Sequence, residues 1–386
     1  MSKGQQHAIA ADHIFDGDAV LRHSAVVVED DVIAAIVPRC ELPLAMRVRT
    51  LPAGTWLAPG FVDVQVNGGG DVLFNDAPTQ TSISRIVAAH RRFGTTSLLP
   101  TLISDTPEKM RAALGAVQDF TSASAGVLGI HLEGPFLSPE KPGAHNPAMI
   151  RRPGPGDVEL ITTPRPQTTV VVTVAPEALP DGFIARLVAS GVRVALGHSM
   201  ATYTETKRAL AEGVTGFTHL FNAMRPLGSR EPGPIAAALE SSAVWFGMIV
   251  DGLHVDPAML RLALRGQARP ILVTDAMPPA GGAKSKFLLH GQDVRVRGKA
   301  CVSTDDTLAG TALTMADAVR NCVDLLDVPL TAALSFASAE PADFLGLGHA
   351  LGRLKPGYRA DMVAFRAEDI HVLTTWVAGC SQDGGS

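Results

Sequence analysis

Two rhythms of apolar residues divide this chain. The first 55 or so residues contain the short apolar runs AVVVED, DVIAAIVP and MRVRTLP, which are broken by Asp, Pro and Gly. This pattern is typical of short β-strands. From about residue 57 onward, longer apolar runs alternate with stretches of helical periodicity, as in α/β folds with a parallel sheet. We therefore predict a small β unit followed by a larger α/β unit.

Eight apolar runs in the second part are predicted to be strands. Helical patterns lie between most of them, for example SISRIVAAHRRFG, TYTETKRALAEG and DPAMLRLALRG, and each of these ends in Gly, a common helix stop. Continuous apolar strands indicate a parallel sheet that is buried on both faces. Eight such units favour a closed (β/α)8 TIM-like barrel, and an open doubly wound sheet is the structural alternative. The predicted strands are Leu57–Val66, Thr96–Pro100, Val127–Glu133, Thr169–Ala175, Val192–His198, Val214–Leu220, Val244–Asp251 and Ile271–Asp275.

Polar residues gather where these strands end, and this favours the barrel, because barrel active sites are built at the C-terminal ends of the strands. After the last strand the chain returns to turns and short strands. A late strand in KPGYRADMVAF is expected to pair with the N-terminal unit. The predicted division is a small β-sandwich domain built from residues 1–56 and 351–386, tail included, and a catalytic barrel at 57–350. The strand-end polar residues are Asp63, Gln65, Asn67, His131, Glu133, His198, His219, Asp251, His254 and Asp275.

Length and composition limit the partners. With 386 residues, 46% of them hydrophobic, the chain suits a barrel of about 250 residues plus a smaller unit. A net charge of −5 argues against nucleic acid or an anionic membrane as a partner. The four cysteines form no CxxC pair, so neither a zinc ribbon nor a disulfide framework is indicated. The N-terminus lacks the apolar core of a signal peptide and no apolar run reaches membrane-helix length, so we expect a cytoplasmic protein.

Three of the candidate residues predict a metal site. Glu133, His198 and His219 all stand at predicted strand ends of one barrel. An ionised Glu is costly to bury unless it is paired or bound to a metal. Two histidines and one carboxylate form a known catalytic zinc set with an open position for water. Strand alternation points His131 to the same side as Glu133, and we interpret His131 as a barrel-layer residue. The remaining histidines outside recognisable motifs are interpreted as surface or core residues: His7, His13, His23, His90, His290, His349 and His371.

Asp275 ends the last predicted strand, in ILVTD. An Asp that faces a metal from this position is well placed to act as a general base toward the metal's water. The alternative is an Asp that caps a loop turn. The glycine-rich NGGGD lacks the Lys-Ser/Thr of a P-loop, and GLGHALG lacks the GxGxxG spacing, so we do not expect nucleotide binding.

Seven motifs follow one another from about Trp56 to Asp361, most of the chain. They are PGFVDVQVNGGGD, HLEGPFLSPEKPGAHNP, GHSMATYTE, THLFNAMRPLGSREPG, DGLHVDP, LVTDAM and LAGTALTMADAV. In this order they resemble the N-acetylglucosamine-6-phosphate deacetylases of the amidohydrolase superfamily. The resemblance implies metal-dependent hydrolysis of the acetamide of N-acetyl-D-glucosamine 6-phosphate to D-glucosamine 6-phosphate and acetate, in amino-sugar catabolism or recycling.

The resemblance also implies roles for individual residues. Glu133, His198 and His219 match the family's metal ligands, and Asp275 matches its catalytic aspartate. In related enzymes the phosphate-binding arginine can reach the neighbouring subunit's site, which implies a homodimer. The positions that match substrate-contacting residues are His145 near the reacting amide, His254 at the sugar or phosphate, Asn222 and Ala223 in the phosphate-side loop, and Arg230 as the phosphate-binding arginine.

One departure from the wider superfamily bears on the number of metal ions. Many members carry His-x-His at the end of the first strand, where this chain has Gln65-Val66-Asn67. It also lacks the bridging lysine of binuclear relatives, since VVVTVAPE stands there. Both absences favour one divalent ion per subunit, with zinc expected. In the one-metal branch, Gln65 and Asn67 touch a water or a weakly held metal.

Three rival functions stay open at this point. A deacetylase for the galactosamine isomer differs only in a sugar epimer. A cyclic-amide hydrolase of the same superfamily is disfavoured by the missing lysine and His-x-His. A non-catalytic sugar-phosphate sensor is disfavoured by the retained ligand set and Asp275.

Overall fold

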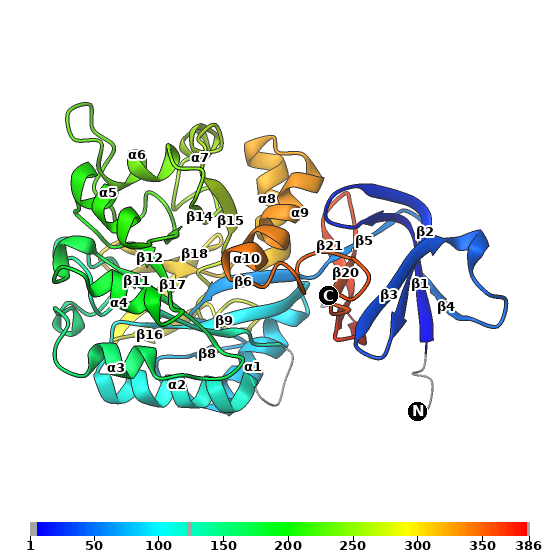
Figure 1. Cartoon of the computed structure of the whole chain (residues 1–386), viewed down its shortest axis with the longest axis horizontal. Helices are drawn as coiled ribbons and strands as arrows, with labels where there is room; N and C mark the ends of the chain where they lie inside the picture. The colour runs from blue at the N-terminus through cyan, green and yellow to red at the C-terminus, as the bar shows by residue number, and fades with distance from the viewer. Residues whose placement is uncertain (1–5, 122–125, 384–386) are drawn as a thin grey trace.

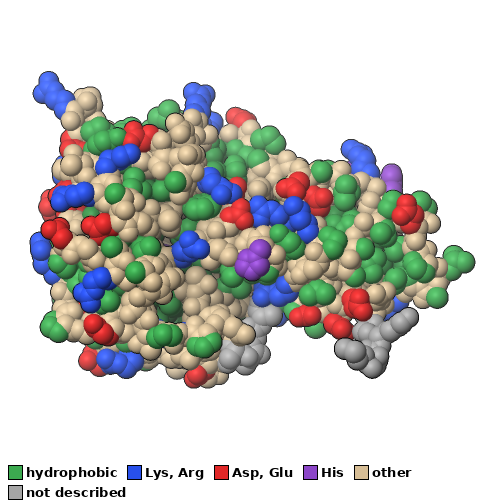
Figure 2. Space-filling model, in the orientation of Figure 1, with side chains coloured by type: hydrophobic (Ala, Val, Ile, Leu, Met, Phe, Trp, Pro, Cys, Tyr) green, Lys and Arg blue, Asp and Glu red, His purple; other side chains and the backbone are tan. Residues whose placement is uncertain are grey.

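The computed structural model describes residues 6–121 and 126–383 and consists of two units that lie side by side (Figure 1). The larger unit is a barrel with surrounding helices, and the smaller unit is a twisted β-sheet. Figure 2 shows positive and negative side chains interspersed over one face of the molecule. Within the described residues, no helix combines the length and the apolar character needed to cross a bilayer.

The larger unit is built on eight parallel strands that follow one another in chain order around the barrel. The first and last strands meet through a bridge between Val66 and Ala276 and a hydrogen bond from Asp275 N to Gln65 O of 3.0 Å. This closure confirms the predicted (β/α)8 barrel and excludes the open sheet. The strands are β6 (Phe61–Val66), β9 (Thr95–Ile103), β10 (Gly129–Glu133), β11 (Thr169–Val174), β12 (Arg193–Leu196), β13 (Gly216–Phe217), β14 (Trp245–Met248) and β15 (Arg269–Leu272).

Helices cover the outside of this barrel, and their ends follow local sequence signals. In α5, Thr202 and Glu205 form a capping box, and Gly213 ends the helix with a φ of 111°. The three helices expected from their periodicity are present as α1, α5 and α7. The outer helices are α1 (Gln80–Arg91), α2 (Pro107–Thr121), α3 (Asp157–Thr162), α4 (Phe183–Ala189), α5 (Tyr203–Glu212), α6 (Gly233–Leu239) and α7 (Pro257–Ala263). Minor elements are β7 (Gly68–Gly69), β8 (Val72–Leu73), η2 (Pro147–Met149) and η3 (Pro176–Ala178).

The segment after the last barrel strand differs from the sequence expectation. An antiparallel sheet comes first: β16 (Lys286–Leu289), β17 (Gln292–Arg297), β18 (Ala300–Ser303) and β19 (Leu308–Thr311). Three helices follow, α8 (Met315–Leu326), α9 (Leu330–Ala337) and α10 (Ala339–Phe344), so the expectation of only turns and short strands was wrong here. Thr314 and Asp317 form a capping box that starts α8. Phe344 of α10 packs into the apolar cluster inside the barrel.

The smaller unit is one eight-stranded sheet to which both ends of the chain contribute. The late strand β20 pairs antiparallel with β5, with Val363 opposite Ala58, which confirms the predicted pairing. The sheet curls over its own apolar cluster, because Ile33 N donates to Tyr358 O at 2.8 Å and Val26 and Trp376 share that cluster. Its elements are β1 (Gln6–Phe15), β2 (Val20–Glu29), β3 (Val32–Pro38), η1 (Arg39–Glu41), β4 (Arg47–Thr50), β5 (Thr55–Pro59), β20 (Met362–Arg366), β21 (His371–Val377) and β22 (Cys380–Asp383).

Two further expectations change at the ends of the small unit. The predicted strand Leu57–Val66 is two strands, because β5 pairs in the small sheet and β6 in the barrel. The chain crosses between the two at Gly60, where a Cβ would lie 2.1 Å from the Thr96 side chain. The C-terminal segment SQDGGS, expected to be a frayed tail, begins inside β22, and residues 384–386 lie outside the described residues. The domain boundaries at 56/57 and 350/351 stay predictions.

Candidate active site

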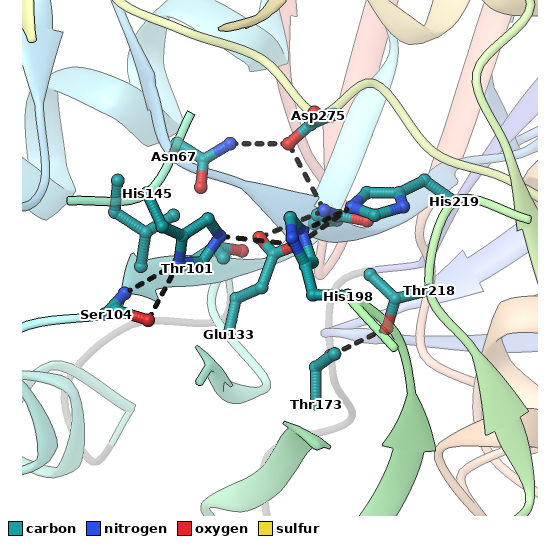
Figure 3. A network of polar contacts seen from close by, with 12 residues as sticks. Asn67, Thr101, Ser104, Glu133, His145, Thr173, His198, Thr218, His219 and Asp275 are labelled. Atoms are coloured by element: carbon teal, nitrogen blue, oxygen red, sulfur yellow. Dashed lines mark hydrogen bonds and ion pairs between the residues drawn. The ribbon is translucent and has the colours of Figure 1, made fainter. Parts of the chain in front are cut away.

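Three buried side chains converge at the C-terminal mouth of the barrel. Glu133 ends β10, while His198 and His219 stand two residues after β12 and β13. Glu133 Oε1 lies 3.1 Å from His198 Nε2 and 2.9 Å from His219 Nε2, and the two Nε2 atoms are 3.2 Å apart. Figure 3 shows the three side chains pointing toward one another. The structure therefore brings the predicted ligand set together.

The backbone is unusual at the residues that follow these strands. His198, His219 and Asp275 have φ values of 47°, 29° and 49°. This left-handed region is uncommon for residues other than glycine. Such conformations cluster at functional sites, where the surrounding fold holds them in place. At each of the three residues the backbone therefore turns away from the extended strand conformation, and the side chain lies in the site.

The donor set fits a divalent metal ion. His198 Nδ1 is 2.9 Å from the Lys141 carbonyl oxygen. A carbonyl can only accept, so Nδ1 carries the hydrogen and Nε2 presents a lone pair in the neutral ring. Burial raises the pKa of Glu133, but the contacts with His198 and His219 bring it well below its usual range, so the carboxylate is ionised. Ligand atoms about 2.1 Å from zinc in a tetrahedron lie roughly 3.4 Å from one another, close to the separations observed.

Asp275 lies beside the ligand set and accepts hydrogen bonds from two side-chain amides, one of which also contacts Glu133. Its Oδ1 accepts from Asn67 Nδ2 at 2.6 Å and from Gln65 Nε2 at 3.2 Å, and Gln65 Nε2 also lies 3.2 Å from Glu133 Oε2. Burial, followed by the nearby Glu133 carboxylate, raises the pKa of Asp275. A carboxylate with a raised pKa beside a metal site suits proton transfer near neutral pH. Gln65 and Asn67 hold carboxylates in place here, and contact with a water or metal stays a prediction.

Two other strand-end residues serve the barrel itself. Thr274 Oγ1 donates to Asp63 Oδ2 at 2.5 Å, which ties β6 to the end of β15. Burial raises the pKa of Asp63 to about 7. His131 lies within hydrogen-bonding distance of the Val64 carbonyl at 3.1 Å and of Thr173 Oγ1 at 2.7 Å. Burial lowers the pKa of His131 to about 4, so the ring is neutral. His131 is a barrel-layer residue, as expected.

His145 is fixed by a residue that sequence reasoning missed. The Ser104 backbone N–H donates to His145 Nδ1 at 3.2 Å, and Ser104 Oγ lies 2.8 Å from the same atom. Burial holds the pKa of His145 well below its usual value, so the ring is neutral and its hydrogen is on Nε2. This Nε2 lies 4.0 Å from Glu133 Oε1. Ser104 directly follows β9, which runs past the predicted strand end at Pro100, so no sequence pattern pointed to it.

One pocket of about 310 Å³ joins these groups. It is lined by the metal-ligand candidates, Asp275 and His145, and also by Asn222, Ala223 and His254. Arg230 is exposed on the loop before α6 and is not among the residues that line the pocket. Glu231 accepts hydrogen bonds from Tyr203 N and Gly233 N, and no ion pair with Arg230 is found within residues 6–121 and 126–383.

Part of the pocket wall comes from a segment whose placement the sequence did not indicate. Thr307, Leu308 and Gly310 reach the pocket from β19 and the turn before it. Thr311 N donates to the Asp275 carbonyl oxygen at 3.0 Å, which places β19 directly against the last strand end. The motif LAGTALTMADAV was the one available signal for this wall.

Two family profiles match the chain. The Amidohydrolase family profile covers residues 56–381, and the NagA composite domain covers residues 7–53. The chain is 39% identical over 378 residues to an N-acetylgalactosamine-6-phosphate deacetylase of Shewanella sp. (strain ANA-3), which covers 95% of each chain. It is 32% identical over 365 residues to an N-acetylglucosamine-6-phosphate deacetylase of Haemophilus influenzae, which covers 93% of this chain and 95% of that one.

A solved structure supports the same grouping. The crystal structure of N-acetylglucosamine-6-phosphate deacetylase from Pasteurella multocida superimposes with a TM-score of 0.94 at 35% identity. The similarity covers 98% of this chain and 100% of that one. It therefore includes the barrel, the small sheet and the segment β16–β19 together.

Proposed function

The chain belongs to the amidohydrolase family, and from this premise we propose that it hydrolyses the acetamide of N-acetyl-D-glucosamine 6-phosphate. The products are D-glucosamine 6-phosphate and acetate, and the setting is amino-sugar metabolism. The observation that carries the proposal is the convergence of Glu133, His198 and His219 in one pocket with Asp275 and His145. Relatives with this activity in their names support the choice of substrate.

The residues around the ligand set account for the reaction. Glu133, His198 and His219 would hold a divalent ion, and this ion would supply Lewis acidity, lowering the pKa of a bound water and polarising the acetamide carbonyl. Asp275 removes the proton from the attacking water and later delivers a proton to the leaving amine. His145 donates its Nε2–H to the oxygen on which negative charge develops. We propose one ion per chain, with zinc as its identity.

Phosphate recognition is the second part of the proposal. Asn222 and the backbone near Ala223 would offer neutral donors, and His254 would face the same end of the substrate. No arginine lines the pocket within the described part of the chain, although Arg is the side chain best suited to grip phosphate with two hydrogen bonds. We propose that the exposed Arg230 reaches the pocket of the partner in a homodimer. A cytoplasmic location belongs to the same proposal.

A second candidate is the galactosamine epimer. The Shewanella relative, at 39% identity, carries that substrate in its name. The two sugars differ only in the orientation of one hydroxyl, and the lining residues carry no feature that selects between them. Amide chemistry and phosphate recognition are common to both candidates, so the residue assignments above hold for either substrate.

The experiment is an acetate-release assay on the purified protein with zinc added. N-acetylglucosamine 6-phosphate, N-acetylgalactosamine 6-phosphate and their unphosphorylated forms are compared at equal concentration. We expect the highest kcat/KM on N-acetylglucosamine 6-phosphate. A higher kcat/KM on the galactosamine isomer would mean that this isomer is the substrate, while the proposed amide hydrolysis would stand. No acetate from any of the four would overturn the enzyme assignment in favour of a sugar-phosphate sensor.

A further inference from the structure

A carboxylate just after β11 reaches the turn that follows the neighbouring strand β12. Glu177 lies in the short turn η3, and β11 pairs in parallel with β12. Its Oε2 accepts a hydrogen bond from Ser199 Oγ at 2.8 Å, and its Oε1 accepts one from the Met200 backbone N–H at 2.5 Å. These donors belong to the first two residues after His198. Both oxygens of Glu177 are therefore bonded to the segment that directly continues a metal-ligand candidate.

The backbone at His198 depends on such contacts. Its φ of 47° lies in the left-handed region, which is sterically unfavourable for a residue with a Cβ. A residue keeps this conformation where the surrounding structure determines it. The His198 carbonyl oxygen accepts from Ser138 N at 2.9 Å, and Ser199 N donates to the Ala223 carbonyl oxygen at 3.0 Å. Glu177 adds two bonds to the same turn from the adjacent barrel strand.

The bonds to Glu177 are stronger than the backbone contacts of this turn. A carboxylate acceptor makes a hydrogen bond charge-assisted, and such bonds are about twice as strong as neutral ones. Ser199 is 0% exposed in the sequence-wide burial pattern, and its hydroxyl also accepts from the Ala201 N–H at 2.9 Å. Without Glu177 the buried hydroxyl would lose its acceptor, which is costly. The turn would then rearrange, and the backbone of His198 would move with it.

We propose that Glu177 is a positioning residue that fixes the turn after β12 and thereby holds His198 in place for metal binding. This inference rests on the proposed function, because it concerns the metal site on which that function depends. Glu177 ends the run VVVTVAPE, in which the bridging lysine of binuclear relatives is absent. None of the three ligand candidates comes from β11. The contribution of this strand end is therefore to orient a ligand on the next strand.

The test uses Glu177→Ala and Glu177→Gln, with Asp181→Ala as the matched control. Asp181 is an exposed carboxylate that lines the same surface pocket of about 150 Å³ as Glu177. Ser199→Ala, which removes one of the two bonds, is the second variant in case Glu177→Ala does not fold. For each protein, the dissociation constant of Zn²⁺ is measured by competition with a chromophoric chelator. The melting temperature of the metal-free protein and the visible spectrum of the Co²⁺-loaded protein are recorded as well.

Glu177→Ala should raise the dissociation constant of Zn²⁺ at least about tenfold, the low end for groups that orient metal ligands. Glu177→Gln keeps an acceptor for the Met200 N–H and should stay within about threefold of the wild type. Ser199→Ala should raise the constant about threefold or more. The Co²⁺ spectrum of Glu177→Ala should change, because it reports the arrangement of the ligands. The metal-free protein should melt no more than about 4 °C lower, and Asp181→Ala should match the wild type.

An unchanged Zn²⁺ dissociation constant in Glu177→Ala, or in Ser199→Ala if the first variant does not fold, would overturn the proposal. An equal loss of affinity in Asp181→Ala would also overturn it, because the effect would then come from surface charge. A large fall in the melting temperature of the metal-free protein, with an unchanged Co²⁺ spectrum, would assign Glu177 to stability alone. If the wild type binds Zn²⁺ but releases acetate from no sugar, the proposed function fails, while the Zn²⁺ affinities still decide the role of Glu177.

Discussion

The two ends of the barrel both carry charged side chains, but these side chains are arranged differently. At the N-terminal end, Arg269 bonds Glu340 at 2.7 Å and Asp343 at 2.9 Å, and Arg353 also bonds Asp343. Trp245 donates to Glu340, and the Arg269 guanidinium lies 4.7 Å from the Trp245 ring centroid. Each of these charged groups contacts one of opposite sign. The charges of these residues are therefore paired with one another at this end of the barrel.

At the C-terminal end of the barrel, side-chain atoms that can each bind a metal ion lie close together. Glu133 and the two ligand histidines bring their lone pairs together, and Asp275 lies a single amide away from Glu133. Three of the residues after the strands also adopt left-handed backbone conformations. The comparison teaches that charged groups pair with one another at one end of the barrel, whereas at the other end three groups of the kind that bind a metal ion converge. Chemistry is expected only at the second end.

The largest expected effect comes from removing a ligand. His198→Ala or His219→Ala should lose the metal and bring turnover below detection, because the remaining two donors no longer define a site. Metal analysis of the wild type should give about one divalent ion per chain, and a chelator should abolish activity that added zinc restores. His349→Ala, an exposed histidine, is the control and should retain both. Two tightly bound ions at equal occupancy would contradict the one-metal site.

Next in size is the loss of the proposed base. Asp275→Asn keeps the shape of the side chain and removes its proton-accepting oxygen, so kcat should fall by at least roughly 10²-fold. Metal should remain largely bound, because the three ligands are unchanged. Turnover and metal content are measured on the same preparation. Near-normal kcat would assign Asp275 to a turn cap, the alternative raised by its place in ILVTD.

A smaller and selective loss is expected at Arg230. Removing a desolvated charge partner costs about 2–5 kcal/mol, so Arg230→Ala should lower kcat/KM on the phosphorylated sugar roughly 30-fold or more. Activity on unphosphorylated N-acetylglucosamine should change little. Light scattering tests the dimer in parallel. Equal losses on both substrates would point to structural damage, and no loss on either would leave Arg230 as a surface charge.

The smallest effect is expected at the other end of the barrel. Glu340→Gln keeps an acceptor for Trp245 but removes the charge facing Arg269, whose side chain is 37% exposed. Solvent screening limits the cost to about 1 kcal/mol or less, or a Tm lower by roughly 1–2 °C, with kcat unchanged. Glu240→Gln, in an exposed pair with Lys207, is the control and should not move Tm. A changed kcat would contradict the separation of the two ends.

Much of the fold and the centre of the site follow from local sequence. Apolar runs with helical stretches between them predicted the barrel strands, because burial on both faces of a parallel sheet leaves a continuous apolar signature. Glu133, His198, His219 and Asp275 stand at the ends of such runs. Since parallel strands in a barrel end at the same rim, their positions along the chain were enough to predict that they would meet.

Other features depend on contacts between segments far apart in sequence. The sequence around Gly60 does not show that the chain passes from one sheet to the other there. Glycine is needed at this point because the Thr96 side chain packs against it. The tautomer of His145 is set by Ser104, 41 residues away. The hydrogen bonds that Asp275 accepts from the side-chain amides of Asn67 and Gln65 join residues 208 and 210 positions apart. The sequence by itself determined which candidate residues gather at one end of the barrel and which end that is. The tertiary structure alone decided their protons and hydrogen-bond partners, because these depend on distances of a few ångströms between strands that only folding brings together.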